Sequence, residues 1–566
     1  FTVTGNLSVD GGTIKLDGNY PVGTDNVALG NTALDSVQSG GSYNVAIGAS
    51  AGTAITTGDA NTAIGDVALI ANTTASNNVA VGSVAMNVNT TGGNNVAVGT
   101  QSLRNNTASN NSAVGYRASH DNTSGTRNVS MGQDAMYQTT TGNDLVGIGN
   151  EALTRNTTGS SNVAIGKEAL SRNTTASNNT AVGHQAAYNN TTGTENTTLG
   201  RVSLLTNTTG NENTAIGSVA LYYNTTGSNN VAVGRQALNN NTTASNNTAV
   251  GFQALLANTT GTANTAIGRN SLQANTTADD NTASGMYSLY TNTTGASNTA
   301  HGRSALFSNT TGSSNVSVGV QALENNTTAS SNTAVGYQAG VSNTTGAFNT
   351  FVGKDSGLSI TTSSNSTFVG EYSGRSTTGG GNTFIGQGAG TAVTSGGNNT
   401  ILGQYTGNQS GLDIRTASDY VVISDGTGLP RAFIAGNAGW FQSNNSASWS
   451  QASDERIKEN ISSLGSSLSK ILSLRPVEFD YKIKDKNHDI GFIAQEYVSI
   501  FPEQVTSNSE VGGEILELTG GDPVLSIEQN LVPYLVKAIQ ELSTNNDALS
   551  TALDAALARI TTLEGE

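Results

Sequence analysis

Hydrophobic and polar positions repeat along most of the chain with a period of about 17 residues. A glycine closes the cycle 23 times, from Gly30 to Gly403, and follows a phrase of the form Asn-[Val/Thr]-Ala-[Ile/Val]. Between successive glycines lies a second phrase, Ala-Leu followed by Asn-Thr-Thr. Alternation in the first phrase predicts one short β-strand per repeat, and the Ala-Leu pair predicts a weaker second strand.

Two short strands and two turns fill such a repeat, whereas a helix plus a strand would not fit comfortably. All six prolines lie outside residues 26–403, and this absence is typical of continuously hydrogen-bonded strands. The repeats therefore predict a mainly β protein whose coils stack as a parallel β-roll or solenoid. Coils about 4.8 Å apart would make a rod of roughly 110 Å.

Period-two alternation assigns the side chains of each strand to two faces. Val231 and Val233 share one face, and we expect these branched residues to fill the coil interior. Asn230, Ala232 and Gly234 share the other face, which is small enough for another chain to approach closely. The recurring asparagine predicts a hydrogen-bonded ladder along the fibre. One narrow roll buries little surface, so we expect several rolls to pack together.

The last coils replace the strand alanine by a bulky residue at Phe351, Phe368, Phe384 and Ile401. This change predicts that the packing partner on that face changes there, where the rod widens or ends.

The repeated phrase resembles the head repeats of trimeric autotransporter adhesins, over about residues 26–403. The resemblance implies a left-handed parallel β-roll with three chains side by side.

The segments on either side of the repeats do not follow the 17-residue pattern. Residues 1–25 predict a β segment that leads into the rod; the same pattern would suit the end of a larger preceding domain. Residues 404–452 predict a β-rich tip with strands near 420–423, 431–434 and 439–441, separated by glycine-containing turns.

Residues 453–566 contain three ordered stretches, SDERIKENI at 453–461, IGFIAQE at 490–496 and LVPYLVKAI at 531–539. They resemble the endosialidase-type intramolecular chaperone at the end of phage tail spikes and fibres. The resemblance implies an α/β domain that trimerises, guides folding of the β structure before it, and then cuts itself off.

The resemblance also implies catalytic roles for two residues. Ser453 would be the nucleophile and Lys458 its general base, with cleavage between Ser453 and Asp454. A serine hydroxyl needs an adjacent base to take its proton, and a desolvated lysine can serve. The spacing of the two residues alone is weak evidence, because most such pairs are ordinary surface residues.

The final stretch predicts a coiled-coil helix, although one amphipathic helix on its own domain would share the pattern. Its apolar seam steps by alternate fours and threes: Leu535, Ile539, Leu542, Asn546, Leu549, Leu553, Ala556, Ile560 and Leu563.

Composition narrows the classes of partner and chemistry. The formal net charge of -16 and a pI near 4.6 argue against nucleic acid. The chain has no cysteine, no apolar run long enough to insert into a membrane, and no calcium-binding repeat motif. We therefore expect no metal and no cofactor. The many Asn-Thr-Thr triplets indicate structural turns rather than glycosylation sites.

The leading hypothesis is a trimeric phage tail fibre that attaches the virion to a host receptor, a polysaccharide or an outer-membrane component. Under this hypothesis the amino-terminal end joins other virion tail proteins. Beyond single-turnover serine autoproteolysis, we expect no enzyme activity. A spike that degrades host polysaccharide and a bacterial trimeric adhesin are the alternatives; the adhesin should end in a membrane-anchoring β-barrel. Trp440, Phe441 and Trp449 are candidate receptor contacts at the tip, although these aromatic residues could instead seal a trimer core.

Overall fold

The computed structural model describes residues 23–436, 440–442, 462–480, 488–508, 524–527 and 531–565. The chain divides into two compact units, Phe1–Trp449 and Ser450–Glu566. The β segment predicted for residues 1–25 lies outside the described residues, except for its last three.

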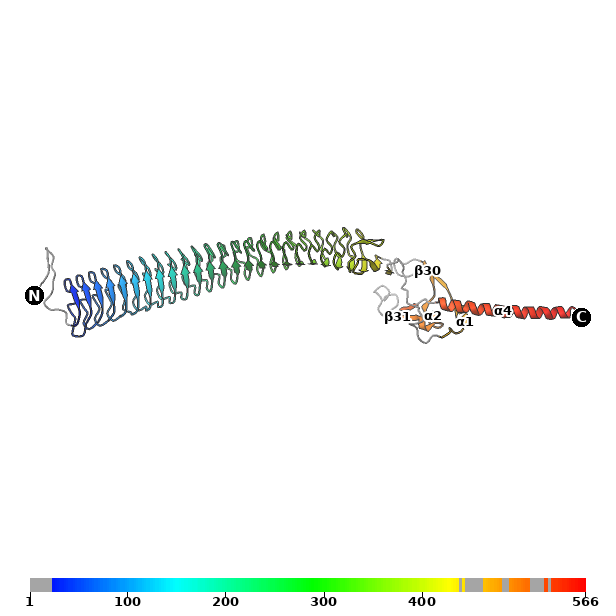
Figure 1. Ribbon diagram of the computed structural model, residues 1–566, viewed down its shortest axis with the longest axis horizontal. Helices are drawn as coiled ribbons and strands as arrows, with labels where there is room; N and C mark the ends of the chain where they lie inside the picture. Colours follow the sequence, from blue (N-terminus) through cyan, green and yellow to red (C-terminus); the bar gives the residue numbers. More distant parts are fainter. Residues whose placement is uncertain are drawn as a thin grey trace. The chain divides into compact units, whose positions relative to one another are not determined.

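The first unit is a parallel β-solenoid in which every coil contributes one three-residue strand (Figure 1). Each strand pairs in parallel with the strand of the next coil, as β13 does with β14 through Val231↔Thr248 and Val233↔Val250. The strands are β1 Val27–Leu29, β2 Val45–Ile47, β3 Thr62–Ile64, β4 Val79–Val81, β5 Val96–Val98, β6 Ser112–Val114, β7 Val129–Met131, β8 Val146–Ile148, β9 Val163–Ile165, β10 Thr180–Val182, β11 Thr197–Leu199, β12 Thr214–Ile216, β13 Val231–Val233, β14 Thr248–Val250, β15 Thr265–Ile267, β16 Thr282–Ser284, β17 Thr299–His301, β18 Val316–Val318, β19 Thr333–Val335, β20 Thr350–Val352, β21 Thr367–Val369, β22 Thr383–Ile385 and β23 Thr400–Leu402.

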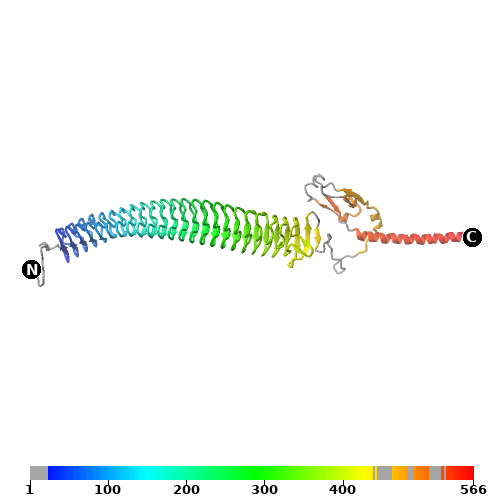
Figure 2. The ribbon, with the colours of Figure 1, turned by 90° about the horizontal axis from the view of Figure 1, so that it is seen from above.

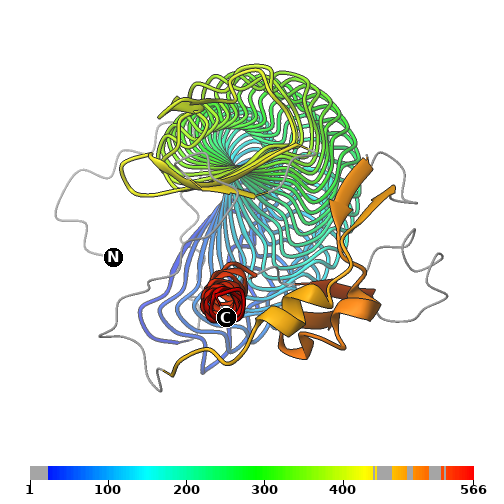
Figure 3. The ribbon, with the colours of Figure 1, turned by 90° about the vertical axis from the view of Figure 1, so that its right-hand side faces the viewer.

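The coils stack in single file along a gently curved shaft (Figure 2). Seen along its length, successive coils rotate gradually about the shaft (Figure 3). This confirms the predicted parallel solenoid. The left hand and the three-chain association implied by the resemblance stay predictions.

The interior of each coil is filled by the strand alanine and the Ala-Leu pair. Ala232, Ala237 and Leu238 are fully buried, whereas Val231 and Val233 on the same coil are only half-buried. The predicted assignment of the two strand faces is therefore wrong, because the branched residues point outward. The coil is so narrow that a small residue, alanine in most coils, lies opposite the leucine.

The Ala-Leu segment is not the predicted second strand. Gln236 and Leu238 have φ of 59° and 52°, a left-handed conformation that no β-strand contains. Alternate amides still bond to the next coil, as Leu238 N–H donates to the Ala254 carbonyl at 2.9 Å and Asn240 N–H to Leu256 at 3.1 Å. The segment is thus hydrogen-bonded between coils but curled within each coil.

Two buried asparagine ladders run through the shaft. The predicted ladder is confirmed, since Asn230 Nδ2 donates to Asn213 Oδ1 at 3.1 Å and to the Ala244 carbonyl at 2.9 Å. The asparagine of each Asn-Thr-Thr triplet makes a second ladder, as Asn241 Nδ2 donates to Asn224 Oδ1 at 2.8 Å. Asn241 is fully buried, so its role is structural, as predicted.

Large and small residues exchange places across the last coils. Phe351 is fully buried, and a Cβ added at Gly357 would lie 2.4 Å from its ring. Gly357 occupies the position where earlier coils have the buried leucine. The packing partner does change, as predicted, but it changes inside the coil. An opposite exchange occurs at Gly147, where a Cβ would lie 2.6 Å from the Met136 side chain.

The glycine that closes each coil cannot accept a side chain. Gly234 has φ of 136°, and a Cβ there would lie 2.5 Å from the Gly251 carbonyl oxygen. We expect Gly234→Ala to destabilise the shaft by about 3 kcal/mol or more, measured by thermal unfolding of the purified shaft. Gly426→Ala is the matched control, because nothing lies within 4 Å of its Cβ position. Equal loss in both variants would contradict this account.

The shaft ends in a small β-rich tip. β26 Tyr420–Ser424 pairs in parallel with β23, and β27 Pro430–Ala435 and β28 Trp440–Gln442 continue antiparallel. A short hairpin, β24 Asn408–Gln409 and β25 Leu412–Asp413, precedes them. The three strands predicted for residues 404–452 are therefore confirmed.

The second unit contains small antiparallel sheets and helices. β29 Val477–Asp480 pairs with β30 His488–Gly491, and β31 Val505–Asn508 pairs with β32 Val524–Ile527. The helices are α1 Leu468–Leu472, α2 Ala494–Tyr497, the 3-10 turn η2 Pro502–Gln504 and the long α4 Val532–Leu563.

Candidate self-association face and carboxy-terminal unit

The outward side of the shaft sheet, here called the strand face, is lined by the first and third residues of each strand. In β13 these residues are Val231 and Val233, on either side of the buried Ala232. Large apolar side chains of this face that are between 36% and 51% exposed include Val27, Leu29, Ile47, Val114, Val129, Met131, Ile165, Leu199, Ile267, Val316, Val335, Ile385 and Leu402.

An uncovered strand face is unusual for a parallel sheet. Parallel sheets are normally covered on both faces, and soluble monomers rarely expose long apolar surfaces. In this shaft one sheet face lies against the coil interior and the other carries half-exposed valine, isoleucine and threonine. The strand face is therefore the candidate contact surface of the shaft.

The tip contains two of the three predicted receptor contacts in one strand. Trp440 and Phe441 belong to β28, which pairs with β27 through Ile434↔Trp440 and Phe433↔Phe441. Trp449 lies outside the described residues.

The three predicted catalytic and cleavage residues, Ser453, Asp454 and Lys458, also lie outside the described residues. Their roles stay predictions.

An aromatic cluster joins the helices of the second unit. Tyr497 and Phe501 are almost fully buried, with ring centroids 5.3 Å apart. Tyr534 at the start of α4 meets Phe501 edge-on, with centroids 4.8 Å apart. Phe492 of the IGFIAQE stretch lies 5.5 Å from the Tyr497 ring, so this stretch is linked through the rings to Tyr534 of LVPYLVKAI.

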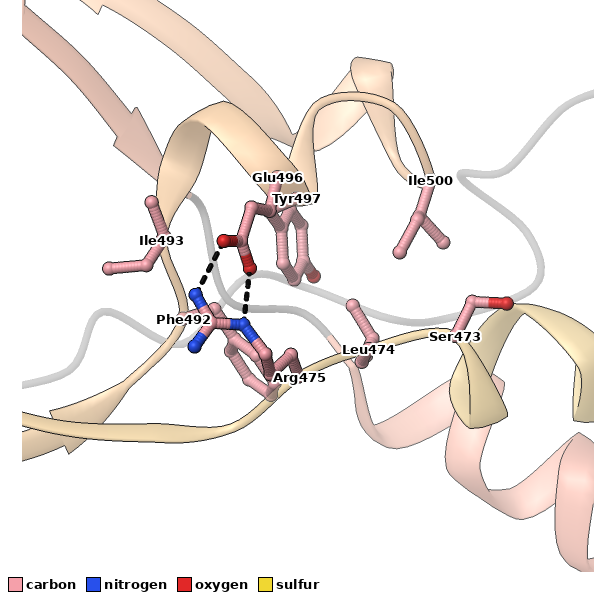
Figure 4. A pocket seen from close by; sticks show the side chains of 8 residues that line it. All are labelled: Ser473, Leu474, Arg475, Phe492, Ile493, Glu496, Tyr497 and Ile500. Carbon is pink, nitrogen blue, oxygen red and sulfur yellow. Dashed lines mark hydrogen bonds and ion pairs between the residues drawn. The ribbon is translucent and has the colours of Figure 1, made fainter.

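A shallow pocket lies beside α2 (Figure 4). Arg475 Nε donates to Glu496 Oε2 at 2.9 Å, and the guanidinium pairs with both oxygens of this carboxylate. This pairing lowers the pKa of Glu496, and both side chains are exposed. Glu496 belongs to the IGFIAQE stretch, so one residue of that motif acts as a local clamp between α2 and the segment after α1.

The carboxylate of Glu541 on α4 holds the start of α1. It accepts hydrogen bonds from the Leu468 amide and the Ser466 hydroxyl, both at 3.0 Å, and from the Ser467 amide at 3.3 Å. A carboxylate at a helix amino terminus satisfies free amides there and interacts favourably with the helix dipole. These bonds, with the Leu468 amide first, lower the pKa of Glu541.

We expect the α1–α4 contact to weaken in acid. A carboxyl whose pKa is lowered by folding stabilises the fold at pH values above its ordinary pKa, near 4.5 for glutamate. The stabilisation is lost as the pH falls through the lower pKa of the folded state. Hydrogen-exchange protection factors at Ser467 and Leu468 should therefore fall below about pH 4, and Glu541→Gln should lower them near pH 6. Glu564→Gln is the control. Equal protection of both amides at about pH 3 and 6 would contradict this role.

The predicted seam of α4 is exposed along most of the helix. Ile539, Leu542, Leu549 and Leu553 are 57–70% exposed, and within the described part of the chain only α1 packs closely along this helix. A 32-residue helix spans about 48 Å, far more than the five-residue α1 can cover. The seam is thus a second apolar surface that no described element covers along most of its length.

Comparison with protein families gives one match. Residues 453–506 match the family model described as chaperone of endosialidase. The matched segment includes the first and second predicted motifs and ends before the third. No curated protein and no solved structure matches the chain.

The match and the solenoid together fit a tail fibre with an endosialidase-type chaperone domain. The two features suggest a protein of the tail fibre or spike type, and the matched family suggests a phage tail protein. Among the residues that the structure describes, no helix has the length and hydropathy to cross a membrane.

Proposed function

We propose that this chain forms a homotrimeric phage tail fibre that attaches the virion to a host-cell surface. The observation that carries the proposal is the chaperone match at residues 453–506, which follows a shaft of 23 parallel coils and its β-rich tip. Such a shaft spans distance, and its charge and composition suit neither nucleic acid nor a membrane.

Three copies would cover the apolar surfaces that one copy leaves exposed. The strand faces would meet along the common axis of the shaft, and the α4 seams would meet as a coiled coil. A polar residue at a core position, here Asn546, would fix the register of the helices and their number in the coiled coil.

The carboxy-terminal unit would act first, by bringing three chains together in register. Near-identical coils can pair with a slip of one repeat at little cost, because every coil offers the same strand to its neighbour. Joining the chains at one end before the coils wind would remove that freedom.

Cleavage would then release the chaperone. The Ser453 hydroxyl supplies the nucleophile and Lys458 removes its proton, with hydrolysis of the bond to Asp454 by one water molecule. The released shaft ends in a carboxylate on Ser453, and the chaperone begins with the amine of Asp454. Residues 404–452 would then form the free end of the fibre.

The tip is the part of the fibre that we assign to the host contact. Trp440, Phe441 and Trp449 would offer aromatic surface to a polysaccharide or an outer-membrane component, and aromatic residues often dominate such interfaces. The opposite end would join other virion tail proteins.

Adsorption of purified fibre to host cells tests this assignment. We expect Trp440→Ala and Trp449→Ala each to weaken cell binding by about tenfold or more while the trimer stays intact. Phe348→Ala is the matched control, since Phe348 is 65% exposed on the shaft. Intact tryptophan variants that bind cells as well as the wild type would contradict a receptor role for the tip.

A further inference from the structure

Charged residues in the middle of the shaft lie on two lines. Between residues 195 and 303 the chain has four arginines and four acids. Every arginine directly follows a repeat glycine, and the acids lie one or two residues before a repeat asparagine. The arginine line is Arg201, Arg235, Arg269 and Arg303; the carboxylate line is Glu195, Glu212 and Asp280, with Asp279 beside the last.

The two lines border opposite edges of the strand face. Glu195 comes just before β11 Thr197–Leu199, and Arg201 comes just after it. They are six positions apart along the chain, a separation of at most about 20 Å. Along the shaft the arginines recur every 34 residues, which is every second coil or about 9.6 Å.

Among the residues that the structure describes, neither line has an ion-pair partner. Leaving Asp279 aside, the four arginines and the three carboxylates are all exposed. No ion pair within the described residues includes any of these seven residues. Asp279 instead accepts hydrogen bonds from the amide and hydroxyl of Thr262, at 2.6 and 2.9 Å.

Two of the four arginines are held in line by an aromatic ring. Phe252 follows the repeat glycine of the coil between Arg235 and Arg269. The guanidinium carbons of these two arginines lie 5.8 and 5.9 Å from its ring centroid, within cation–π range. The ring thus orders two neighbouring charges, and Arg269 is held further by a hydrogen bond from its Nε to Asn270 Oδ1 at 3.2 Å.

We propose that the arginine line of one copy pairs with the carboxylate line of the next copy around the fibre axis. This inference rests on the proposed trimer and names the edges by which its subunits meet. In a parallel cyclic assembly the strand faces turn inward, and the end of one strand meets the start of its neighbour's. Such an interface is heterologous, so opposite charges on the two edges are what it requires.

The axial positions suit this pairing. Glu195 and Arg201 flank the same strand, so they lie at one level in copies without stagger. Glu212, before β12, lies one coil from both Arg201 and Arg235, a distance of about 4.8 Å along the axis. Asp280 before β16 is related in the same way to Arg269 and Arg303.

The spacing of the two charge lines does not fix the axial register of the copies. A slip of one coil still leaves every carboxylate within one coil of an arginine. The lines therefore select the neighbouring edge and the parallel direction, and the register must come from the carboxy-terminal unit. If one copy were turned end for end about an axis parallel to the strands, the arginine edge of one strand face would meet the arginine edge of the other.

Charge reversal tests the pairing. One variant changes Arg201, Arg235, Arg269 and Arg303 to glutamate, a second changes Glu195, Glu212 and Asp280 to lysine, and a third combines both sets. We expect each single-line variant to shorten the trimer lifetime at low salt by at least about tenfold, with less effect at high salt. The combined variant should restore the lifetime. Arg155→Glu with Arg172→Glu, at exposed sites away from the strand face, is the control.

The outcomes separate this inference from the proposed function. If the single-line variants have the wild-type trimer lifetime and salt dependence, the pairing is overturned while the proposed trimer is unaffected. The same holds if the combined variant does not recover the wild-type trimer lifetime. A wild-type chain that never trimerises would overturn the proposed function itself. A heparin column provides a further outcome. If retention of the protein on heparin is lost with the arginine line while the trimer lifetime is unchanged in every variant, the pairing is overturned and the arginines bind an acidic polymer instead.

Discussion

Ser453→Ala should leave the chain whole, whereas the wild-type chain is expected as two fragments. The serine hydroxyl makes the first attack in the proposed reaction, before water completes the hydrolysis, so its loss should slow cleavage by about a thousandfold or more. Lys458→Ala should have the same outcome, because an unassisted serine is a poor nucleophile. Denaturing gels with intact mass measure both, and the wild-type masses should correspond to ends at Ser453 and Asp454.

Ser462→Ala provides the matched control, since Ser462 is an exposed serine a short distance along the chain. It should cleave as the wild type does. Cleavage that persists in Ser453→Ala, or a wild-type boundary at another bond, would contradict the assigned roles.

Deleting residues 453–566 should reduce the yield of soluble trimeric shaft by at least about tenfold. Each coil contains left-handed residues other than glycine, such as Gln236, Leu238 and Asn246, with φ between 52° and 63°. Each costs roughly 1–2 kcal/mol, so a coil is stable only when its neighbours are already formed. Without the chaperone no step fixes the first coils or their register. Native mass of the soluble fraction measures the yield.

The uncleaved variant Ser453→Ala separates chaperone action from cleavage. It keeps the whole carboxy-terminal unit and should therefore trimerise at nearly the wild-type level. A truncated chain that forms trimers as efficiently as this variant would contradict the need for a chaperone.

The repeat period was sufficient to predict a parallel solenoid, because a strict period forces equivalent residues into register. It was not sufficient to predict the strand faces. Branched residues such as Val231 and Val233 are the usual core of a sheet, but here Leu238 from the opposite wall leaves room only for the methyl group of Ala232. The Ala-Leu phrase gave no sign of its left-handed backbone, since leucine rarely adopts that conformation.

The exchange at the end of the shaft could have been found from the sequence. Phe351 appears in the strand where glycine replaces leucine on the opposite wall, at Gly340 and Gly357. Paired changes of that kind indicate contact across one coil. The catalytic pair and Trp449 fall outside the described residues, so those predictions still depend on the motif resemblance.

The mass of the released shaft under native conditions tests the central claim most directly. After cleavage and separation from the chaperone, the account predicts a particle that contains three copies of the fragment ending at Ser453. A shaft that contains one copy, while remaining soluble and folded, would contradict the claim that the strand faces associate in a trimer.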